Sequence, residues 1–192
     1  MSLRHAILGV LAAREMTGYD LSQFFDSGMG WLWSARHSQI YPLLGKLVDE
    51  GLVSGSEGTR GQHQRRVTYA ITDAGRAEFL DWVGTAHPSS AEKDPFWLQA
   101  VFLDEVDPER ARGVLRAYAD GQREAALRAT SHATELAAGI TPLIRERLTH
   151  RPAAEHDRIT RVKAQVFSAQ AAIATTRAEQ AEALISVLAE TS

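Results

Sequence analysis

The chain has 192 residues, 44% of them hydrophobic and 23% charged, and its formal net charge is −3. This composition is typical of a globular protein with one ordinary domain or two small ones, and the absence of cysteine excludes a disulfide scaffold, thiolate zinc sites and thiol catalysis. No run approaches the roughly 18 apolar residues that a membrane-spanning helix needs, so we expect a cytoplasmic protein with no membrane partner.

Helical periodicity marks three segments within the first 50 residues. A first helix is predicted by apolar residues at spacings of three and four: Leu3, Ala6, Ile7, Val10 and Leu11. Thr17 and Asp20 form a capping-box pattern that opens a second helix. A third helix is predicted from about residue 37 to residue 50, and Gly51 then follows as a good terminating residue.

The third predicted helix has an apolar face and a polar face. The apolar face is formed by Ile40, Leu43, Leu44, Leu47 and Val48. The opposite face carries Ser38, Gln39, Tyr41, Pro42, Gly45, Lys46 and Asp49. A helix with this pattern buries one side and presents the other to solvent or to a partner.

From residue 52 the pattern changes from helical to extended. Val67, Tyr69 and Ile71 alternate with other residues, and glycines at positions 55, 58 and 61 supply turns. These features predict a two-stranded hairpin with a basic tip. Between residues 59 and 70 there is no acid, and the basic residues are Arg60, His63, Arg65 and Arg66. Because Thr72 then caps a fourth helix, residues 1–85 are predicted to form a winged helix-turn-helix domain.

The second half of the chain is predicted to be helical throughout. Residues 86–93 predict a linker, and residues 94–192 a helical domain. Asp107 followed by Pro108 opens a long helix, which Pro142 should kink or end early, and the last helix runs from about residue 154 to residue 189. The predicted fold class is therefore mainly α with a small β-hairpin wing: an N-terminal winged helix-turn-helix plus a C-terminal helical dimerisation domain.

The last predicted helix carries a long apolar stripe with no evident partner in its own chain. Its members are Ile159, Val162, Val166, Ile173, Leu184 and Leu188. A small domain cannot bury so long a stripe alone, whereas a second chain can cover it in the manner of a coiled coil. We therefore expect a homodimer held together by these residues.

Three ordered blocks of the N-terminal domain resemble the PadR family of transcriptional regulators. They are ILGVL and MTGYDL at residues 7–11 and 16–21, IYPLL, KL and EGLV within residues 40–53, and RRVTYAITDAGR at residues 65–76. The tail, with Asp94-Pro95-Phe96 and two long helices, is similar to the larger PadR subfamily that has a C-terminal helical dimerisation domain. One departure is that Arg36 and His37 stand before the third helix, where the family often has a small capping residue.

The resemblance implies a repressor of a double-stranded DNA operator, with the third helix in the major groove and the wing on the backbone. The DNA-binding candidates are Ser38, Gln39, Tyr41, Pro42, Lys46, Arg60, His63, Arg65 and Arg66. Gln39 can pair bidentately with adenine, and Lys46 and Arg66 suit phosphate. Because the sequence pI is about 6.2, any basic surface must be local. The alternative to DNA binding by the third helix is that its polar residues form an ordinary solvated helix face. For the arginines of the hairpin, the alternative is a charged edge strand that resists aggregation.

The resemblance also implies an aromatic or drug-like effector, which a pocket walled by aromatic rings would suit. The candidates are Phe24, Trp31, Trp33, Phe96 and Trp97, and ordinary packing of the two domains is the favoured alternative. No catalytic motif is present and no two histidines have metal-ligand spacing on one helix, so we expect no enzyme activity, metal or cofactor. Two other functions stay open: a winged-helix module for protein or RNA, and a helical assembly factor without DNA binding.

Overall fold

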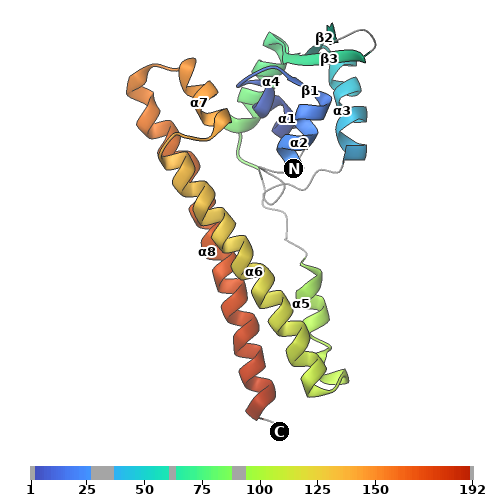
Figure 1. Cartoon of the computed structure of the whole chain (residues 1–192), viewed down its shortest axis with the longest axis vertical. Helices are drawn as coiled ribbons and strands as arrows, with labels where there is room; N and C mark the ends of the chain where they lie inside the picture. Colours follow the sequence, from blue (N-terminus) through green and yellow to red (C-terminus); the bar gives the residue numbers. More distant parts are fainter. Residues whose placement is uncertain (1–2, 27–36, 61–63, 88–93, 191–192) are drawn as a thin grey trace. The chain divides into compact units, whose positions relative to one another are not determined.

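The computed structural model describes residues 3–26, 37–60, 64–87 and 94–190 (Figure 1). The chain divides into two compact units, Met1–Pro88 and Ser89–Ser192, and this division falls inside the stretch expected to be a linker. In the described residues, the first unit contains helices and a small sheet, and the second contains helices. The predicted fold class, mainly α with a small β wing, is confirmed.

The N-terminal unit, called here the winged-helix unit, contains α1 (Leu3–Leu11), β1 (Met16–Thr17), α2 (Gly18–Phe24), α3 (His37–Asp49), β2 (Val53–Arg60), β3 (Gln64–Ile71) and α4 (Asp73–Gly84). The strands form one antiparallel sheet in the order β1-β3-β2. The sequence predicts only the β2–β3 hairpin. The additional strand β1 pairs Met16 with Tyr69 and Thr17 with Thr68, and two residues are too few to show the alternation that predicts a strand.

The core of the winged-helix unit is built from the helix faces that spacing predicts. Side chains from α1, α2, α3 and their flanks are almost completely buried: Ile7, Leu8, Leu21, Phe25, Ile40, Leu44, Leu47 and Val53. Burial of each such side chain contributes roughly 1.5–3 kcal/mol relative to exposure. Tyr69 and Ile71 of β3 pack against the same cluster, which attaches the base of the hairpin to the helices.

Close contacts also join α3, the hairpin and α4. A Cβ at Gly75, in the first turn of α4, would lie 2.0 Å from the Leu52 carbonyl oxygen, so only glycine fits there. The Thr72 hydroxyl donates to the Gly51 carbonyl at 2.7 Å and accepts from the Gly75 amide at 3.1 Å, which caps α4 as predicted. Gly51, two residues after the last residue of α3, has φ +70°, in keeping with its predicted role as the terminating residue.

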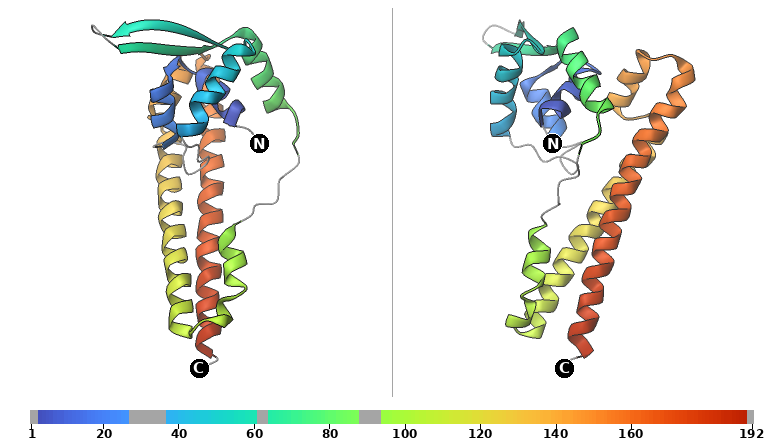
Figure 2. Two further views of the ribbon diagram at one scale, coloured as in Figure 1. Left: turned by 90° about the vertical axis from the view of Figure 1, so that its right-hand side faces the viewer. Right: turned by 180° about the vertical axis from the view of Figure 1, so that it is seen from behind.

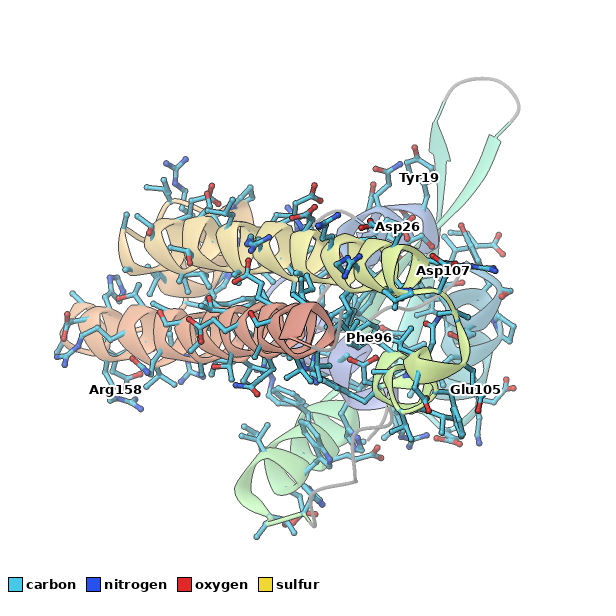
Figure 3. All side chains as sticks on the ribbon, turned by 90° about the horizontal axis from the view of Figure 1, so that it is seen from below. Tyr19, Asp26, Phe96, Glu105, Asp107 and Arg158 are labelled. Atoms are coloured by element: carbon cyan, nitrogen blue, oxygen red, sulfur yellow. The ribbon has the colours of Figure 1, made fainter. Side chains whose placement is uncertain are left out.

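The C-terminal unit, called here the helical-hairpin unit, consists of two long helices and shorter ones beside them. Its elements are α5 (Pro95–Ala100), the 3-10 turn η2 (Leu103–Glu105), α6 (Pro108–Ala137), α7 (Pro142–Thr149) and α8 (Ala153–Glu190). α6 and α8 lie side by side and run in opposite directions (Figures 1 and 2). Phe96 of α5 packs against α6 and the C-terminal part of α8 (Figure 3). No helix in the described part of the chain is long and apolar enough to cross a membrane.

A seam of small side chains lies between α6 and α8. Its buried members include Ala119, Ala129 and Ala133 of α6 and Ala171, Ala174, Ala178 and Ala181 of α8. Small residues let two helix backbones approach closely, and the distance between helix axes depends on the side chains at the contact. Arg123 of α6 forms an ion pair with Glu182 of α8, and the His132 ring meets the Phe167 ring at 4.5 Å. α8 therefore has a long partner within its own chain.

This packing corrects part of the expectation for the apolar stripe of α8. Val162, Val166 and Ile173 are 59%, 47% and 44% exposed, so their side chains lack full cover from the described chain, as expected, and Ile159 is half-buried. Leu184 and Leu188 instead pack partly buried against the cluster formed by α5, α6 and α8. The expectation that the whole stripe lacks a partner in its own chain is wrong for these two leucines, because α5 and α6 cover them.

The long helix ends before Pro142, which is one of the two outcomes expected, but a glycine precedes the proline at the break. α6 ends at Ala137, and Gly139 follows with φ +68°. Pro142 is the first residue of α7, after Thr141, whose hydroxyl accepts from the Ile144 amide. The glycine ends α6 before the proline is reached, and the proline takes the first helical position, where its missing N–H costs nothing.

Candidate nucleic-acid interface

The outer face of α3 presents the polar residues that the sequence predicts. The residues of this face are all exposed: Ser38, Gln39, Tyr41, Pro42, Gly45, Lys46 and Asp49. Tyr41 is 50% exposed and the Lys46 side chain 68%, whereas Ile40, Leu44 and Leu47 on the opposite side are 0% exposed. The outer face is free of contacts at Gly45, where a Cβ would meet nothing within 4 Å. A rigid helix with this distribution can be inserted into a groove by its outer face.

Contacts with α2 hold α3 in place. Thr17 and Asp20 form the predicted capping box at the start of α2: the Thr17 hydroxyl accepts from the Asp20 amide at 3.1 Å, and the Asp20 carboxylate accepts from the Thr17 amide at 3.3 Å. The ring of Tyr41 lies directly on Gly18, where a Cβ would be 2.6 Å from a ring carbon. Tyr41 therefore packs on α2 with one part of its ring while its other part remains exposed.

Tyr19, at the start of α2, is a surface residue that the sequence-based candidates omit. Its side chain is 59% exposed, and its hydroxyl accepts from the Gln23 side chain at 2.9 Å. Figure 3 labels its position. In the sequence Tyr19 is part of the capping-box block, which indicates where a helix starts but not which of its side chains faces outward.

The β2–β3 hairpin extends the unit beyond the helices. Its register runs from Val53 opposite Ile71 to Arg60 opposite Gln64, with Gly58 opposite Arg66 and Thr59 opposite Arg65. The three candidate arginines therefore belong to the last paired positions before the tip. The structure describes the backbone of these arginines, and His63 lies outside the described residues. The hairpin brings them together on one projecting element, which is the geometry of a wing.

Charged side chains link α1 to the residue that follows α3 and to the middle of α4. Arg4 forms ion pairs with Glu50, which follows α3, and with Glu78 of α4. These contacts raise the pKa of Arg4 and lower that of Glu78, in both cases mainly through the hydrogen bonds between the two side chains. His5 stacks on Trp82 with 4.6 Å between ring centroids, and burial lowers the pKa of His5. Arg4 was not among the sequence-based candidates.

Three aromatic candidates for an effector site lie in the described residues, and each packs in or against the core of its own unit. Phe24 packs against the core of the winged-helix unit and meets Phe25 edge-on. In the helical-hairpin unit Phe96 is 8% exposed and stacks on Tyr118 with 3.4 Å between centroids, and Trp97 meets both rings edge-on. Trp31 and Trp33 lie outside the described residues. Within the described residues no group of three or more His, Asp or Glu side chains could hold a metal ion.

The helices around α3 and the projecting hairpin define a winged helix-turn-helix protein. Residues 7–81 match the family model described as the transcriptional regulator PadR-like family. The match predicted from the motifs is therefore found over the winged-helix unit, and it is a match to a family of transcriptional regulators.

Individual relatives agree with this match. The chain is 37% identical over 115 residues to the negative transcriptional regulator PadR of Bacillus subtilis, a stretch that covers 59% of this chain and 63% of the relative. The match therefore spans less than two thirds of the relative's length. The crystal structure of Bacillus subtilis PadR in complex with operator DNA has a TM-score of 0.70 and 28% identity, over 98% of this chain and 97% of that one. The structure of the same protein with p-coumaric acid has a TM-score of 0.67 and 26% identity, over 97% and 94%.

Proposed function

We propose that the protein is a homodimeric, sequence-specific DNA-binding repressor of the cytoplasm, which a small aromatic molecule releases from its operator. The observation that carries this proposal is the exposed polar face of α3 beside a projecting hairpin. A structural relative crystallised with operator DNA supports it. In this proposal residues 1–85 form the DNA-reading domain, residues 94–192 form the dimerisation domain, and residues 86–93 link them.

The charges on α3 suggest how it would lie in the groove. Asp49 and Glu50 stand at its C-terminal end, where carboxylates would be repelled by DNA phosphates. The N-terminal end carries Ser38 and Gln39 and the positive end of the helix dipole. We therefore place Ser38, Gln39 and Pro42 nearest the bases, with Gln39 as the bidentate reader of an adenine. Tyr41 and Lys46 would contact the backbone.

The wing would supply contacts that do not depend on sequence. We assign Arg60, His63, Arg65 and Arg66 to phosphates beside the groove, where each neutralised phosphate strengthens binding and adds to its salt dependence. Arg66 is the strongest candidate. It alternates with Tyr69 along β3, so it falls on the same face of the strand as Thr68 and Ala70 and not on the face that packs on the core. Arg65 falls on the same face of β3 as Tyr69, so a structural role is also open to it.

Dimerisation would place two α3 helices on one operator. A two-fold axis relates two such helices, and two half-sites about 34 Å apart fit one turn of DNA. We propose that Val162, Val166 and Ile173 contact the partner, because they are large, apolar and exposed. Ile159, Leu184 and Leu188 would lie along the same interface, with the two leucines also packing on α5 and α6.

An aromatic acid is the effector class that the p-coumaric acid complex of the relative supports. Such a ligand can release DNA only if it binds one arrangement of the two reading domains better than the other. Of the candidates, Phe24, Trp31 and Trp33 precede α3, and Phe96 and Trp97 begin the helical unit. The closed stack of Phe96 on Tyr118 favours a packing role for Phe96, because a ligand would first have to displace the tyrosine ring.

Fluorescence anisotropy with labelled duplexes tests the proposal. The protein is titrated against fragments of the DNA upstream of its own gene and against shuffled fragments of the same base composition. We expect preference for one fragment by a factor of about 10³ or more at physiological salt, and loss of that preference on addition of p-coumarate or a related phenolic acid. Equal affinity for all duplexes, or stronger binding to RNA, would contradict the proposal.

A further inference from the structure

Arg4 is the centre of a charge network that reaches the outer face of α3. Its Nη2 donates to Glu78 Oε2 at 2.8 Å and its Nε donates to Glu78 Oε1, so the guanidinium is held bidentately on α4. Its remaining nitrogen, Nη1, donates to Glu50 Oε2. The other oxygen of Glu50 lies 3.9 Å from Lys46 Nζ. Glu50 thus stands between two cations, and one of them is a proposed phosphate ligand.

The two cations hold Glu50 with unequal strength. The Arg4 side chain is 24% exposed and is fixed by two hydrogen bonds to Glu78, whereas the Lys46 side chain is 68% exposed and meets Glu50 only at the distance of a loose ion pair. An arginine fork that is already oriented loses little entropy when it binds a carboxylate. An exposed lysine in an i,i+4 pair gains only about 0.3–0.5 kcal/mol. Glu50 therefore belongs mainly to Arg4, and Lys46 can leave it at little cost.

We propose that Arg4 is a positioning residue for DNA binding, which neutralises Glu50 at the end of α3 and so leaves Lys46 available to a DNA phosphate. This inference rests on the proposed function. Without Arg4, Glu50 would have Lys46 as its one counter-ion among the described residues. Lys46 would then either stay with Glu50 or, on binding a phosphate, leave the Glu50 charge unneutralised beside the DNA. Both outcomes weaken phosphate binding, and both act through Glu50.

The dependence on Glu50 gives a test that a purely structural role for Arg4 would fail. Four full-length proteins are compared by operator anisotropy: wild type, Arg4→Gln, Glu50→Gln and the double variant. We expect Arg4→Gln to weaken operator binding about fivefold, the size of a coupling between neighbouring charged groups. We expect Glu50→Gln to restore affinity to within about twofold of wild type in the Arg4→Gln background, because the unpaired carboxylate is gone.

Salt dependence supplies the second readout. Arg4→Gln should reduce the slope of log affinity against log salt by up to about one, the contribution of one phosphate contact. In a Lys46→Gln background it should not reduce the slope by a further phosphate contact, and the remaining loss of affinity should come from the Glu50 charge alone. If Arg4→Gln proves too unstable for measurement, Glu50→Gln alone decides. The proposal expects unchanged or stronger binding from it, whereas a structural Arg4–Glu50 bridge requires weaker binding.

The outcomes separate this inference from the proposed function. Wild-type protein that shows no preference among duplexes would contradict the proposed function itself. Selective wild-type binding, with additive losses from Arg4→Gln and Glu50→Gln, would leave the DNA-binding function intact and overturn the role of Arg4.

Discussion

The winged-helix unit and the helical-hairpin unit bury different kinds of side chain. In the first, the fully buried residues are large and come from several elements, as with Leu8 of α1, Leu21 of α2 and Leu44 of α3. In the second, the seam between the long helices is largely alanine, while Leu127 and Val162 are 72% and 59% exposed. The difference lies in the cores, since both units also expose large apolar side chains, such as Leu80 of α4 in the first and Ile173 of α8 in the second. Exposed apolar surface of this kind is suited to bind another surface.

The largest effect is expected where the exposed apolar residues of α8 are charged. Ile173→Glu should leave α6 and α8 packed, because the alanine seam lies on another side of α8, and should prevent a second chain from binding. Loss of the dimer removes simultaneous binding to two half-sites, so operator affinity should fall about 100-fold or more. Analytical ultracentrifugation should show a monomer with unchanged helical circular dichroism.

Thr175→Glu is the matched control for this variant. Thr175 is also exposed and lies two residues along α8, about 200° around the helix from Ile173. It should leave both sedimentation and affinity unchanged. A dimeric Ile173→Glu protein would place the partner surface elsewhere and remove the functional meaning of the exposed stripe.

The next prediction compares the two cores: a smaller side chain should destabilise the first, and a larger side chain should destabilise the second. Leu44→Ala in α3 should destabilise the winged-helix unit by about 2–5 kcal/mol, because it leaves a cavity in a core of large side chains. Ala181→Leu in α8 should destabilise the helical-hairpin unit by about 1–3 kcal/mol, because the close helix contact has no room for the added atoms. Urea unfolding followed by hydrogen exchange would assign each loss to its unit. Tolerance of leucine at position 181 would contradict the tight seam.

These two cores also explain which features could be predicted from the sequence. The helices α1 and α3 and the hairpin have large apolar residues at regular spacing, so their patterns are strong. The seam of α8 is made of Ala171, Ala174, Ala178 and Ala181, which a search for Ile, Val and Leu does not detect. The spacing of the larger apolar residues therefore predicts a partner chain for the whole stripe, although α5 and α6 cover part of it.

The candidate site divides in the same way. The outer face of α3 follows from local periodicity, which predicts each of its polar residues. Periodicity is wrong for Val48, which it assigns to the buried face and which is 38% exposed. The partners of Arg4 lie 46 and 74 residues away in the sequence, at Glu50 and Glu78, and a single sequence holds no local signal that joins them. Long-range ion pairs become visible only when the fold brings α1, α3 and α4 together.

Within the winged-helix unit, the helix and the wing should differ in what they contribute to binding. Gln39→Ala should lower affinity for the operator by about 1–3 kcal/mol and relax preference at one base pair, because it removes a bidentate base contact. Arg66→Ala should weaken binding to all duplexes alike and reduce the salt slope by about one. Binding to a panel of single-base operator variants at three salt concentrations would measure both. Unchanged base preference in Gln39→Ala would mean that another residue reads that position.

The smallest effect concerns a charge inside the helical-hairpin unit. Lys163 of α8 is half-buried, and burial, with a smaller contribution from the nearby Arg147 charge, lowers its pKa from 10.5 to about 8. Below pH 8 the folded unit therefore holds a charged amine that would be better hydrated in the unfolded chain. Between pH 8 and pH 10.5 the folded chain releases this proton before the unfolded chain does, so stability should rise with pH across that window.

Lys163→Met should accordingly stabilise the unit by about 1–2 kcal/mol at pH 7, allowing for partial solvent screening, and should remove the rise in stability between pH 8 and pH 10.5. Urea unfolding of the full-length protein at pH 7 and pH 10 measures both effects. Arg161→Met is the matched control, since the Arg161 side chain on the same helix is 77% exposed and its loss should change stability by less than about 0.5 kcal/mol. A Lys163→Met protein that is less stable than wild type would contradict this prediction. Because the neighbouring Val162 belongs to the proposed dimer surface, such a result would indicate that the amine has an anionic partner in the dimer, and that this partner outweighs the cost of burying the charge.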